Sequence, residues 1–261
     1  MATIEDVARY YDGWTSRYLR LWGDILEARR PSDTMELLNY LTTRIGLKGG
    51  MHVLDAGCGV CGPALHFATH LDLRIEAVTV SSEQVRIARE KVAAAGLGAK
   101  VNVRLGDYHH LKDLFAEGAF DGVYFLESLG HSTRVGEVIR SAWSVLKDGG
   151  FLFVKDMFLK EADDPELAAA IARQAGRIND NYAYNVPDLH VVLSAMRKAG
   201  FEIRRLCDLG FESDNTYVEE FERQYDVQVY DGHTDLMPVE WLEILCRKPA
   251  QHPGAATAPT A

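Results

Sequence analysis

A short run of chemically useful residues separates an apolar stretch from an apolar helical pattern. Residues 51–54 read as a buried strand, Asp55 ends it, and Gly57, Gly59 and Gly62 follow as a G-x-G-x-x-G turn. Because glycine lacks a Cβ atom, such a turn can be tight and a ligand can approach its backbone, while the following helix offers free N–H donors. The pattern predicts a ligand site in which Asp55 is an acceptor suited to an ammonium group.

A glutamate and a histidine follow a second apolar stretch. Residues 120–126 predict a strand, and Glu127-Ser-Leu-Gly-His131 comes directly after it. In open α/β sheets ligands bind beyond the carboxyl ends of the strands, so we expect Glu127 and His131 to face the reacting atoms. The alternative role for this glutamate is that of a helix cap or a salt-bridge partner.

The next strand distinguishes between two kinds of cofactor. A dinucleotide site needs an acidic residue about twenty residues after the glycines, but this chain has Thr79-Val-Ser-Ser-Glu-Gln84 there. The run Val-Leu-Asp-Ala-Gly-Cys-Gly at residues 53–59 resembles the first motif of class I S-adenosylmethionine-dependent methyltransferases. Residues 77–84 are similar to the second motif as it occurs in the carbon-methylating branch.

The resemblance implies a set of contacts to S-adenosylmethionine. In that family the acid and the glycines bind the amino acid part, threonine and glutamine contact the ribose, and an acid after the third strand accepts from the adenine amino group. We also expect an aromatic ring beside the adenine. The residues concerned are Asp55, Gly57 and Gly59 for the amino acid part, Thr79 and Gln84 for the ribose, and Asp107 and Tyr108 for the adenine.

The segment from Glu127 to His131 is also similar to stretches of geranyl diphosphate, sterol and related isoprenoid C-methyltransferases. Methylation of an alkene leaves a carbocation, which aromatic faces can stabilise and a carboxylate can quench by removing a proton. We therefore predict C-methylation of a small isoprenoid molecule of secondary metabolism, with Glu127 as base and His131 orienting it or shuttling the proton. The prenyl diphosphate branch further implies a diphosphate substrate with bound Mg²⁺.

Aromatic residues recur every four positions near the N-terminus and would share one face of a helix over residues 4–23. This face either packs into the core or covers the substrate, as the N-terminal helix does in the resembled family. A second substrate-side region is expected at residues 157–187. The predicted substrate contacts are Tyr10, Trp14, Tyr18, Arg177 and Tyr182.

Two other functions remain open at this point. An N- or O-methyltransferase would use His109, His110 or His131 as its base, although neighbouring positions on an extended chain point to opposite faces. A protein that binds the cofactor without turnover is the other alternative. Replacement of Glu127 separates carbon methylation from N- or O-methylation, and only activity excludes a protein that binds without turnover.

The pattern of strands and helices predicts an α/β fold of the Rossmann-like methyltransferase class. We expect a seven-stranded sheet, with six parallel strands and a reversed seventh, and helices on both faces. Residues 1–46 would form an N-terminal helical cover and residues 47–249 the methyltransferase domain, with the insertion at 157–187. Residues 250–261 are rich in Ala and Pro and are predicted to be disordered.

Amino-acid composition restricts the kinds of molecule that the chain is expected to bind. The 261 residues carry a formal net charge of −10, which argues against a nucleic-acid substrate, since binding to phosphates needs clustered Lys and Arg. There is no apolar run of roughly 18 residues and no signal-peptide pattern, so no membrane contact and a cytoplasmic location are expected. Cys58 and Cys61 form a lone C-x-x-C, and we predict no metal site in the chain itself. A homo-oligomer remains an open possibility.

Overall fold

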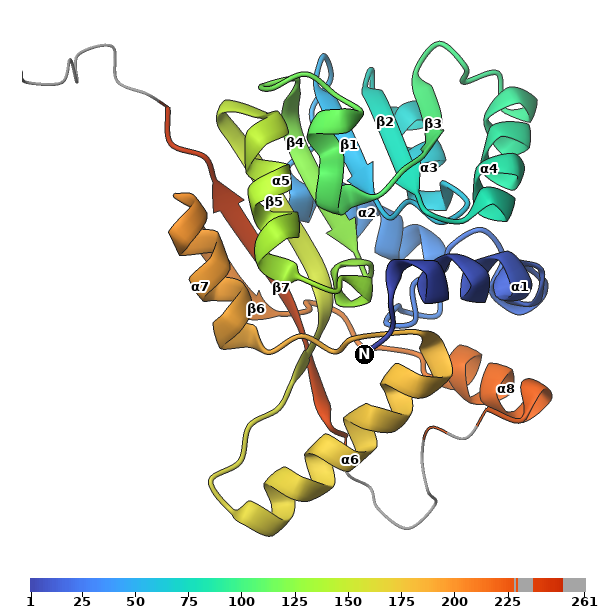
Figure 1. The fold of residues 1–261 in the computed structure, drawn as a ribbon. Helices are drawn as coiled ribbons and strands as arrows, with labels where there is room; N and C mark the ends of the chain where they lie inside the picture. The colour runs from blue at the N-terminus through green and yellow to red at the C-terminus, as the bar shows by residue number, and fades with distance from the viewer. Residues whose placement is uncertain (228, 230–236, 251–261) are drawn as a thin grey trace, which may run out of the picture.

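The chain folds around a seven-stranded sheet (Figure 1). A computed structural model describes residues 1–227, 229 and 237–250. The strand order is β3-β2-β1-β4-β5-β7-β6, and β7 runs antiparallel to β5 and β6 while the other pairs are parallel. The strands are β1 (His52–Ala56), β2 (Arg74–Thr79), β3 (Val101–Leu105), β4 (Phe120–Leu126), β5 (Leu146–Leu159), β6 (Glu202–Asp208) and β7 (Val239–Arg247). The predicted fold class is confirmed.

Helices cover both faces of this sheet, and each face has its own hydrophobic cluster. One face is packed by α2 (Thr34–Ile45), α3 (Gly62–His70) and α4 (Ser82–Ala94), and the other by η1 (Tyr108–Asp113), α5 (Val135–Val145) and α7 (Leu189–Ala199). Because both faces are buried, residues 122–126 of β4 form a continuous apolar run rather than an alternating one. The short helix η2 (Leu129–His131) follows β4.

A third cluster lies beyond the carboxyl ends of the parallel strands. It joins α1 (Ile4–Trp22), α6 (Pro165–Tyr182) and α8 (Thr216–Tyr225), which Figure 1 shows together below the sheet. Tyr18 and Trp22 of α1 pack there with Ile178 and Phe221. The N-terminal helix and residues 165–182, far apart in sequence, therefore share one lobe.

Local sequence signals set the helix boundaries. The side chains of Asp33, Ser81 and Asp188 each accept a hydrogen bond from a backbone N–H group at the start of α2, α4 and α7. Gly46, at the end of α2, has the left-handed conformation common at helix ends. The bounds of β4 agree with the strand predicted at residues 120–126.

The fifth strand extends into the region expected to be an insertion. It begins at Leu146 and continues to Leu159, because residues beyond Asp156 pair with Trp241, Glu240 and Val239 of β7. Three residues of the expected insertion therefore belong to the sheet. Except for Ala250, the tail for which disorder was predicted lies outside the described residues.

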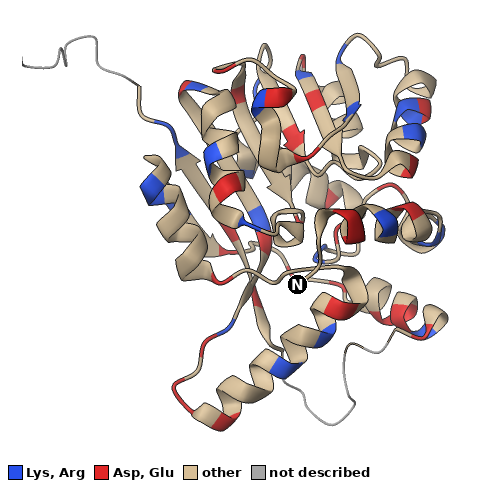
Figure 2. Cartoon of the chain, in the orientation of Figure 1, with Lys and Arg blue, Asp and Glu red and all other residues tan. Residues whose placement is uncertain are grey.

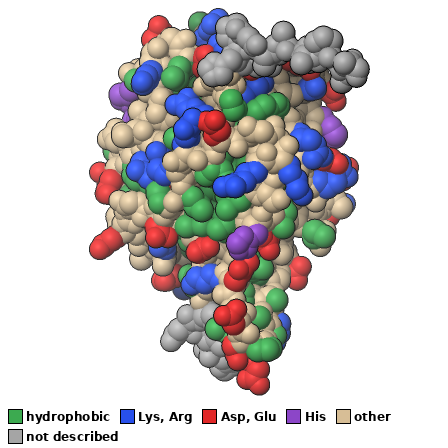
Figure 3. Space-filling model, turned by 90° about the vertical axis from the view of Figure 1, so that its left-hand side faces the viewer, with side chains coloured by type: hydrophobic (Ala, Val, Ile, Leu, Met, Phe, Trp, Pro, Cys, Tyr) green, Lys and Arg blue, Asp and Glu red, His purple; other side chains and the backbone are tan. Residues whose placement is uncertain are grey.

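The surface shows no marked separation of charge in the described part of the chain. Lys and Arg are distributed over many elements and interspersed with Asp and Glu (Figure 2). Hydrophobic side chains gather near the middle of the face shown in Figure 3, and Val191 of α7 and Leu206 of β6 are among the exposed hydrophobic residues. Across the described ranges, no helix has both the length and the apolar character needed to cross a membrane.

Close packing of β4 on β5 yields a stability prediction. A Cβ atom at Gly122 would lie 2.0 Å from Cζ of the buried Phe151 ring. We expect Gly122→Ala to lower the free energy of unfolding by about 1–3 kcal/mol, because the ring must move within a filled core. Urea denaturation of the purified protein measures this.

Gly176 in α6 is the matched control, because a Cβ atom there meets open space. Gly176→Ala should raise the free energy of unfolding by roughly 0.5–1 kcal/mol, since alanine favours helix. Equal effects of the two substitutions would contradict the packing assigned to Gly122.

Candidate active site

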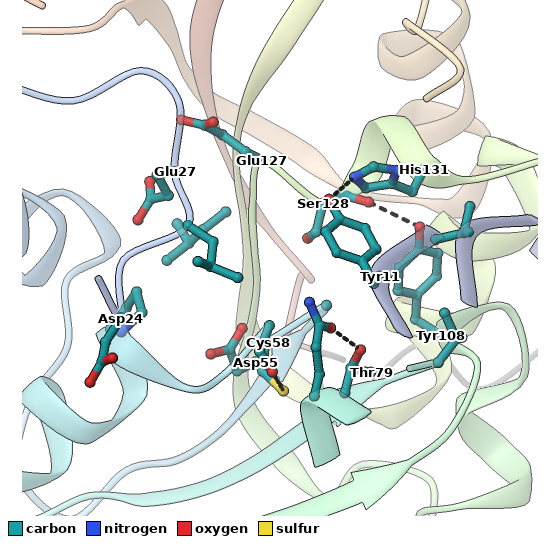
Figure 4. Close-up of a pocket in the computed structure, with 18 of the residues that line it drawn as sticks. Tyr11, Asp24, Glu27, Asp55, Cys58, Thr79, Tyr108, Glu127, Ser128 and His131 are labelled. Carbon is teal, nitrogen blue, oxygen red and sulfur yellow. Dashed lines mark hydrogen bonds between the residues drawn. The ribbon is translucent and has the colours of Figure 1, made fainter. Parts of the chain in front are cut away.

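A cavity lies at the carboxyl ends of β1, β2 and β4 (Figure 4). Strand β1 has β2 on one side and β4 on the other, and ligands of open α/β sheets bind at such a reversal of strand order. We call this space the first cavity. The predicted residues that line it are Asp55, Gly57, Gly59, Thr79, Gln84, Tyr108, Glu127 and His131.

The glycine turn forms the floor of the first cavity. Gly57 has a φ of 90°, and a Cβ atom there would lie 2.4 Å from Cβ of Ser128. Ser128 is itself fixed, because its hydroxyl donates to the carbonyl oxygen of Ala56 at 2.6 Å. Gly59 has a φ of 53° and lies against Leu26. Both glycines are therefore required by conformation, and the first also by space.

Asp55 is a buried carboxyl group in the wall of this cavity, only 2% exposed. Burial raises its pKa to about 8, and the nearby Glu27 carboxylate adds to the shift. A cationic group beside Asp55 would reverse this shift, because it stabilises the ionised form. The environment therefore suits the ammonium ligand predicted for this residue.

The predicted ribose and adenine contacts are only partly brought together. The Thr79 hydroxyl donates to Oε1 of Gln84 at 2.6 Å, and both side chains line the first cavity. Tyr108 also lines it, and its hydroxyl donates to the Ser128 carbonyl oxygen at 2.9 Å. Asp107 is not among the lining residues, and its Oδ1 accepts from the backbone N–H and Nδ1 of His109 instead.

Two of the three candidate histidine bases lie elsewhere. The His109 side chain is buried in its pair with Asp107, and His110 is exposed. Neither is among the residues that line the two cavities described here. His131 is therefore the remaining histidine candidate.

Glu127 belongs to a buried ionic network centred on Lys155. The Lys155 ammonium donates to Glu127, to Oε2 of Glu27 at 2.6 Å and to the Arg29 carbonyl oxygen at 2.8 Å. Backbone N–H groups of Ala28 and Arg29 donate to Glu127 at 2.6 and 3.1 Å. Although burial alone would lower the pKa of Lys155, the two glutamates raise it overall. The predicted salt-bridge role of Glu127 is therefore present alongside its position in the cavity wall.

His131 is buried beside Tyr11 and Tyr184. Its Nδ1 lies 2.9 Å from the carbonyl oxygen of Ala183, which can only accept, so Nδ1 carries the proton in the neutral ring. Nε2 then accepts from the Tyr11 hydroxyl at 2.8 Å. Burial lowers the His131 pKa to about 4. His131 hydrogen-bonds to these groups rather than to Glu127, so it does not orient that carboxylate directly.

Glu127 also lines a second, larger cavity of about 510 Å³. Its walls come from α1, α6, α8, β5 and β7. Tyr11, Glu127 and His131 line both cavities. The aromatic residues of the second cavity are Tyr11, Tyr18, Trp22, Tyr182, Tyr184 and Trp241.

Of the predicted substrate contacts, Tyr18 and Tyr182 line the second cavity, while Tyr10, Trp14 and Arg177 do not. Tyr10 stacks on Trp14, which packs against Phe221 of α8, so this part of the aromatic stripe fills the core. Arg177 is exposed on α6. The residues of α1 that line the second cavity are Tyr11, Tyr18 and Trp22. Near the start of the helix the cavity is therefore lined by Tyr11 and not by its predicted neighbour Tyr10.

Sequence reasoning missed three residues of the site. The predicted substrate contact was Tyr10 and not its neighbour Tyr11. Glu27 lies in a connecting segment that contains no recognisable motif. Of these three residues, Lys155 could have been recognised from the sequence. It is a charged residue inside the apolar run Phe-Leu-Phe-Val-Lys-Asp, and a charge in such a run needs a buried partner.

Comparison with known proteins identifies the family. Residues 33–228 match the model of the mycolic acid cyclopropane synthetase family. The chain belongs to this family. It is also 31% identical over 179 residues to the sterol 24-C-methyltransferase erg6 of Aspergillus fumigatus, covering 67% of this chain and 46% of that protein. The resemblance to class I S-adenosylmethionine-dependent methyltransferases is thus confirmed.

Solved structures share the fold of this member of the mycolic acid cyclopropane synthetase family. The [4+2]-cyclase SpnF has a TM-score of 0.79 and 23% identity, with 95% of this chain and 97% of that chain covered. Geranyl diphosphate C-methyltransferase from Streptomyces coelicolor A3(2), solved with Mg²⁺, geranyl diphosphate and S-adenosylhomocysteine, has a TM-score of 0.71 and 17% identity over 94% and 97%. The chain spans about half the length of the curated relatives it matches first, 46% and 52%.

The pKa of Asp55 predicts how stability changes with pH. Because the folded protein holds a proton on Asp55 up to about pH 8, whereas an unfolded carboxyl loses it near pH 4, this group makes unfolding easier as pH rises through that window. Asp55→Asn should remove this contribution, which is at most about 1.4 kcal/mol per pH unit. Urea denaturation at about pH 5, 6.5 and 8, without cofactor, measures the difference.

The variant should therefore gain stability relative to wild type as pH rises. Asp72→Asn is the matched control, because it removes a carboxylate that is 89% exposed. Parallel pH profiles for wild type and Asp55→Asn would contradict the assignment of a protonated, buried Asp55.

Proposed function

We propose that this chain is an S-adenosylmethionine-dependent methyltransferase that methylates a carbon atom of a largely apolar, unsaturated small molecule of the isoprenoid class, with Glu127 as base. The observation that carries the proposal is the position of Glu127. Its carboxylate lies where the first and second cavities meet. Aromatic side chains line the second cavity beside it.

The first cavity fits S-adenosylmethionine. Asp55 and the unsubstituted Gly57 and Gly59 suit the amino acid end, while Thr79, Gln84 and Tyr108 offer polar and aromatic contacts for the adenosine end. The bound cofactor supplies an electrophilic methyl group. The chain contributes binding, orientation and the removal of a proton.

The backbone at Glu127 supports a functional role. Its φ of 51° lies in the left-handed region, which a non-glycine residue adopts at a cost of about 1–3 kcal/mol. This conformation turns the chain at the end of β4, and the Lys155 network then holds the carboxylate in place. Strain of this kind persists where the surroundings fix it and is frequent in active sites.

The strength of the available bases favours carbon over oxygen as the methylated atom. A hydroxyl acceptor needs a strong base, but His131 has a pKa of about 4 and its Nε2 already accepts from Tyr11. A carbocation loses a neighbouring proton readily, so an ordinary carboxylate is sufficient. The surrounding tyrosine and tryptophan faces would stabilise the positive charge before the proton leaves.

The charged residues that line the second cavity restrict the polar end of the acceptor. Glu127, Glu219 and Glu222 are acidic, and Arg29 is the one basic residue among the described lining residues. A diphosphate would meet repulsion here unless Mg²⁺ accompanied it. Since Mg²⁺ is often held through substrate phosphates and one or two carboxylates, we expect any prenyl diphosphate to be methylated only when Mg²⁺ is present.

Substitution of Glu127 and His131, the two candidate bases, tests which atom of the acceptor is methylated. We expect Glu127→Gln to lower kcat by roughly 10²–10⁴-fold, the usual contribution of a general base, with little change in Kd for S-adenosylhomocysteine. His131→Gln should lower kcat much less. The measurement is mass-spectrometric product formation on isopentenyl, dimethylallyl, geranyl and farnesyl diphosphates with and without Mg²⁺, alongside amines and phenols.

The reverse pattern would overturn the proposal. Near-normal turnover by Glu127→Gln, with loss of activity in His131→Gln on an amine or phenol, assigns the base to the histidine and the methyl group to nitrogen or oxygen. Binding of S-adenosylmethionine without turnover of any acceptor would favour a cofactor-binding protein.

A further inference from the structure

Glu27 is a buried carboxylate in the wall of the first cavity, in the segment that joins α1 to α2. It is only 3% exposed. Its Oε2 is bound to Lys155, but its Oε1 is buried and accepts no hydrogen bond from any residue that the structure describes. A buried carboxylate oxygen without a donor is costly, so its presence in a cavity wall points to a donor on the ligand.

The charges around Glu27 indicate what kind of donor is required. Lys155 carries one positive charge and is shared by Glu27 and Glu127. Asp55 is a third acidic group in the same wall, and Figure 4 shows Glu27 and Asp55 among the residues around this cavity. Glu27 and Glu127 share the single ammonium group of Lys155, and a neighbouring cation would also favour ionisation of the buried Asp55. A ligand with a compact positive charge would therefore complete the network.

The two ends of the cavity differ in chemistry. Thr79, Gln84 and Tyr108 form the end suited to an adenosine. Figure 4 draws Glu27 and Asp55 to the left of Thr79 and Tyr108, and Asp55 belongs to β1, the strand that leads into the glycine turn. The amino acid part of the cofactor therefore belongs with the two acids.

We propose that Glu27 binds the α-ammonium group of S-adenosylmethionine through Oε1, together with Asp55. This inference rests on the proposed cofactor and adds a residue that the motif does not contain. Glu27 also precedes residues 33–228, the part of the chain that the family model matches. The cofactor's ammonium group would thus be held by β1 from one side and by the α1–α2 connection from the other.

Two ligands separate this role from a purely structural one. S-adenosylhomocysteine carries the ammonium group, whereas 5′-methylthioadenosine has the adenosine and the thioether but lacks the amino acid. For Glu27→Gln, calorimetric titration near pH 7 should show a Kd for S-adenosylhomocysteine that is raised roughly tenfold or more, the worth of one charged hydrogen bond. The Kd for 5′-methylthioadenosine should change by less than about twofold.

A matched variant and a third ligand sharpen the test. Glu27→Asp keeps the carboxylate but shortens the side chain by one methylene group. This variant should therefore lose less affinity for S-adenosylhomocysteine than Glu27→Gln does, and its affinity for 5′-methylthioadenosine should again be nearly unchanged. This variant also serves if Glu27→Gln does not fold. S-adenosylmethionine should lose affinity by the same factor as S-adenosylhomocysteine, because both carry the ammonium group and only the former carries a sulfonium.

Three results would overturn the inference while leaving the proposed function standing. These are equal losses for 5′-methylthioadenosine and S-adenosylhomocysteine, no loss for either, or a loss confined to S-adenosylmethionine, which would place Glu27 at the sulfonium. Failure of the wild-type protein to bind S-adenosylhomocysteine at all would overturn the proposed cofactor, and this inference with it.

Discussion

The buried ammonium group of Lys155 is the interaction on which the site depends. It joins three parts of the chain: β5, the end of β4 through Glu127, and the α1–α2 connection through Glu27 and the Arg29 carbonyl. Lys155 is fully buried, and an unpaired ammonium there would be prohibitively costly. Loss of one member of such a network typically costs about 3–5 kcal/mol. The network therefore fixes the N-terminal segment against the sheet as well as positioning Glu127.

The cover formed by α1 is held by polar contacts in addition to its aromatic packing. Asp12 of α1 accepts from the Ser81 hydroxyl at 2.6 Å and from the Glu83 backbone N–H at 3.0 Å, at the N-terminus of α4. A carboxylate is favoured at this end of a helix by its free N–H groups and its dipole. Asp24 pairs with Lys91 of α4 at 2.7 Å. Helix α1, whose residues Ile4, Val7 and Tyr11 line the first cavity, is thus joined to the sheet's helices by side-chain contacts at α4.

Motifs with a fixed backbone requirement could be predicted from the sequence, whereas side-chain placement in the lobe could not. The glycine turn and the ends of β4 follow from local rules, and the structure agrees with them. Thr79 and Gln84 were identified through the family resemblance instead, and both line the first cavity. The choice between Tyr10 and Tyr11 depends on how α1 rotates against α8, which helical spacing alone does not fix. The partner of Asp107 was missed for a related reason, because η1 places His109 within reach of it.

The position of Glu127 between the cavities has a consequence for charge. In the proposed function the first cavity takes a cationic cofactor and the second an acceptor that becomes positive during the reaction, so both would benefit from the same acidic wall. If Glu27 and Glu127 lacked Lys155 between them, their mutual repulsion and burial would favour protonation of one carboxyl group. With Lys155 present, one ammonium group is shared by two carboxyl groups. In the proposed function Glu27 would face the cofactor and Glu127 the acceptor, so a single lysine would hold both acids in place.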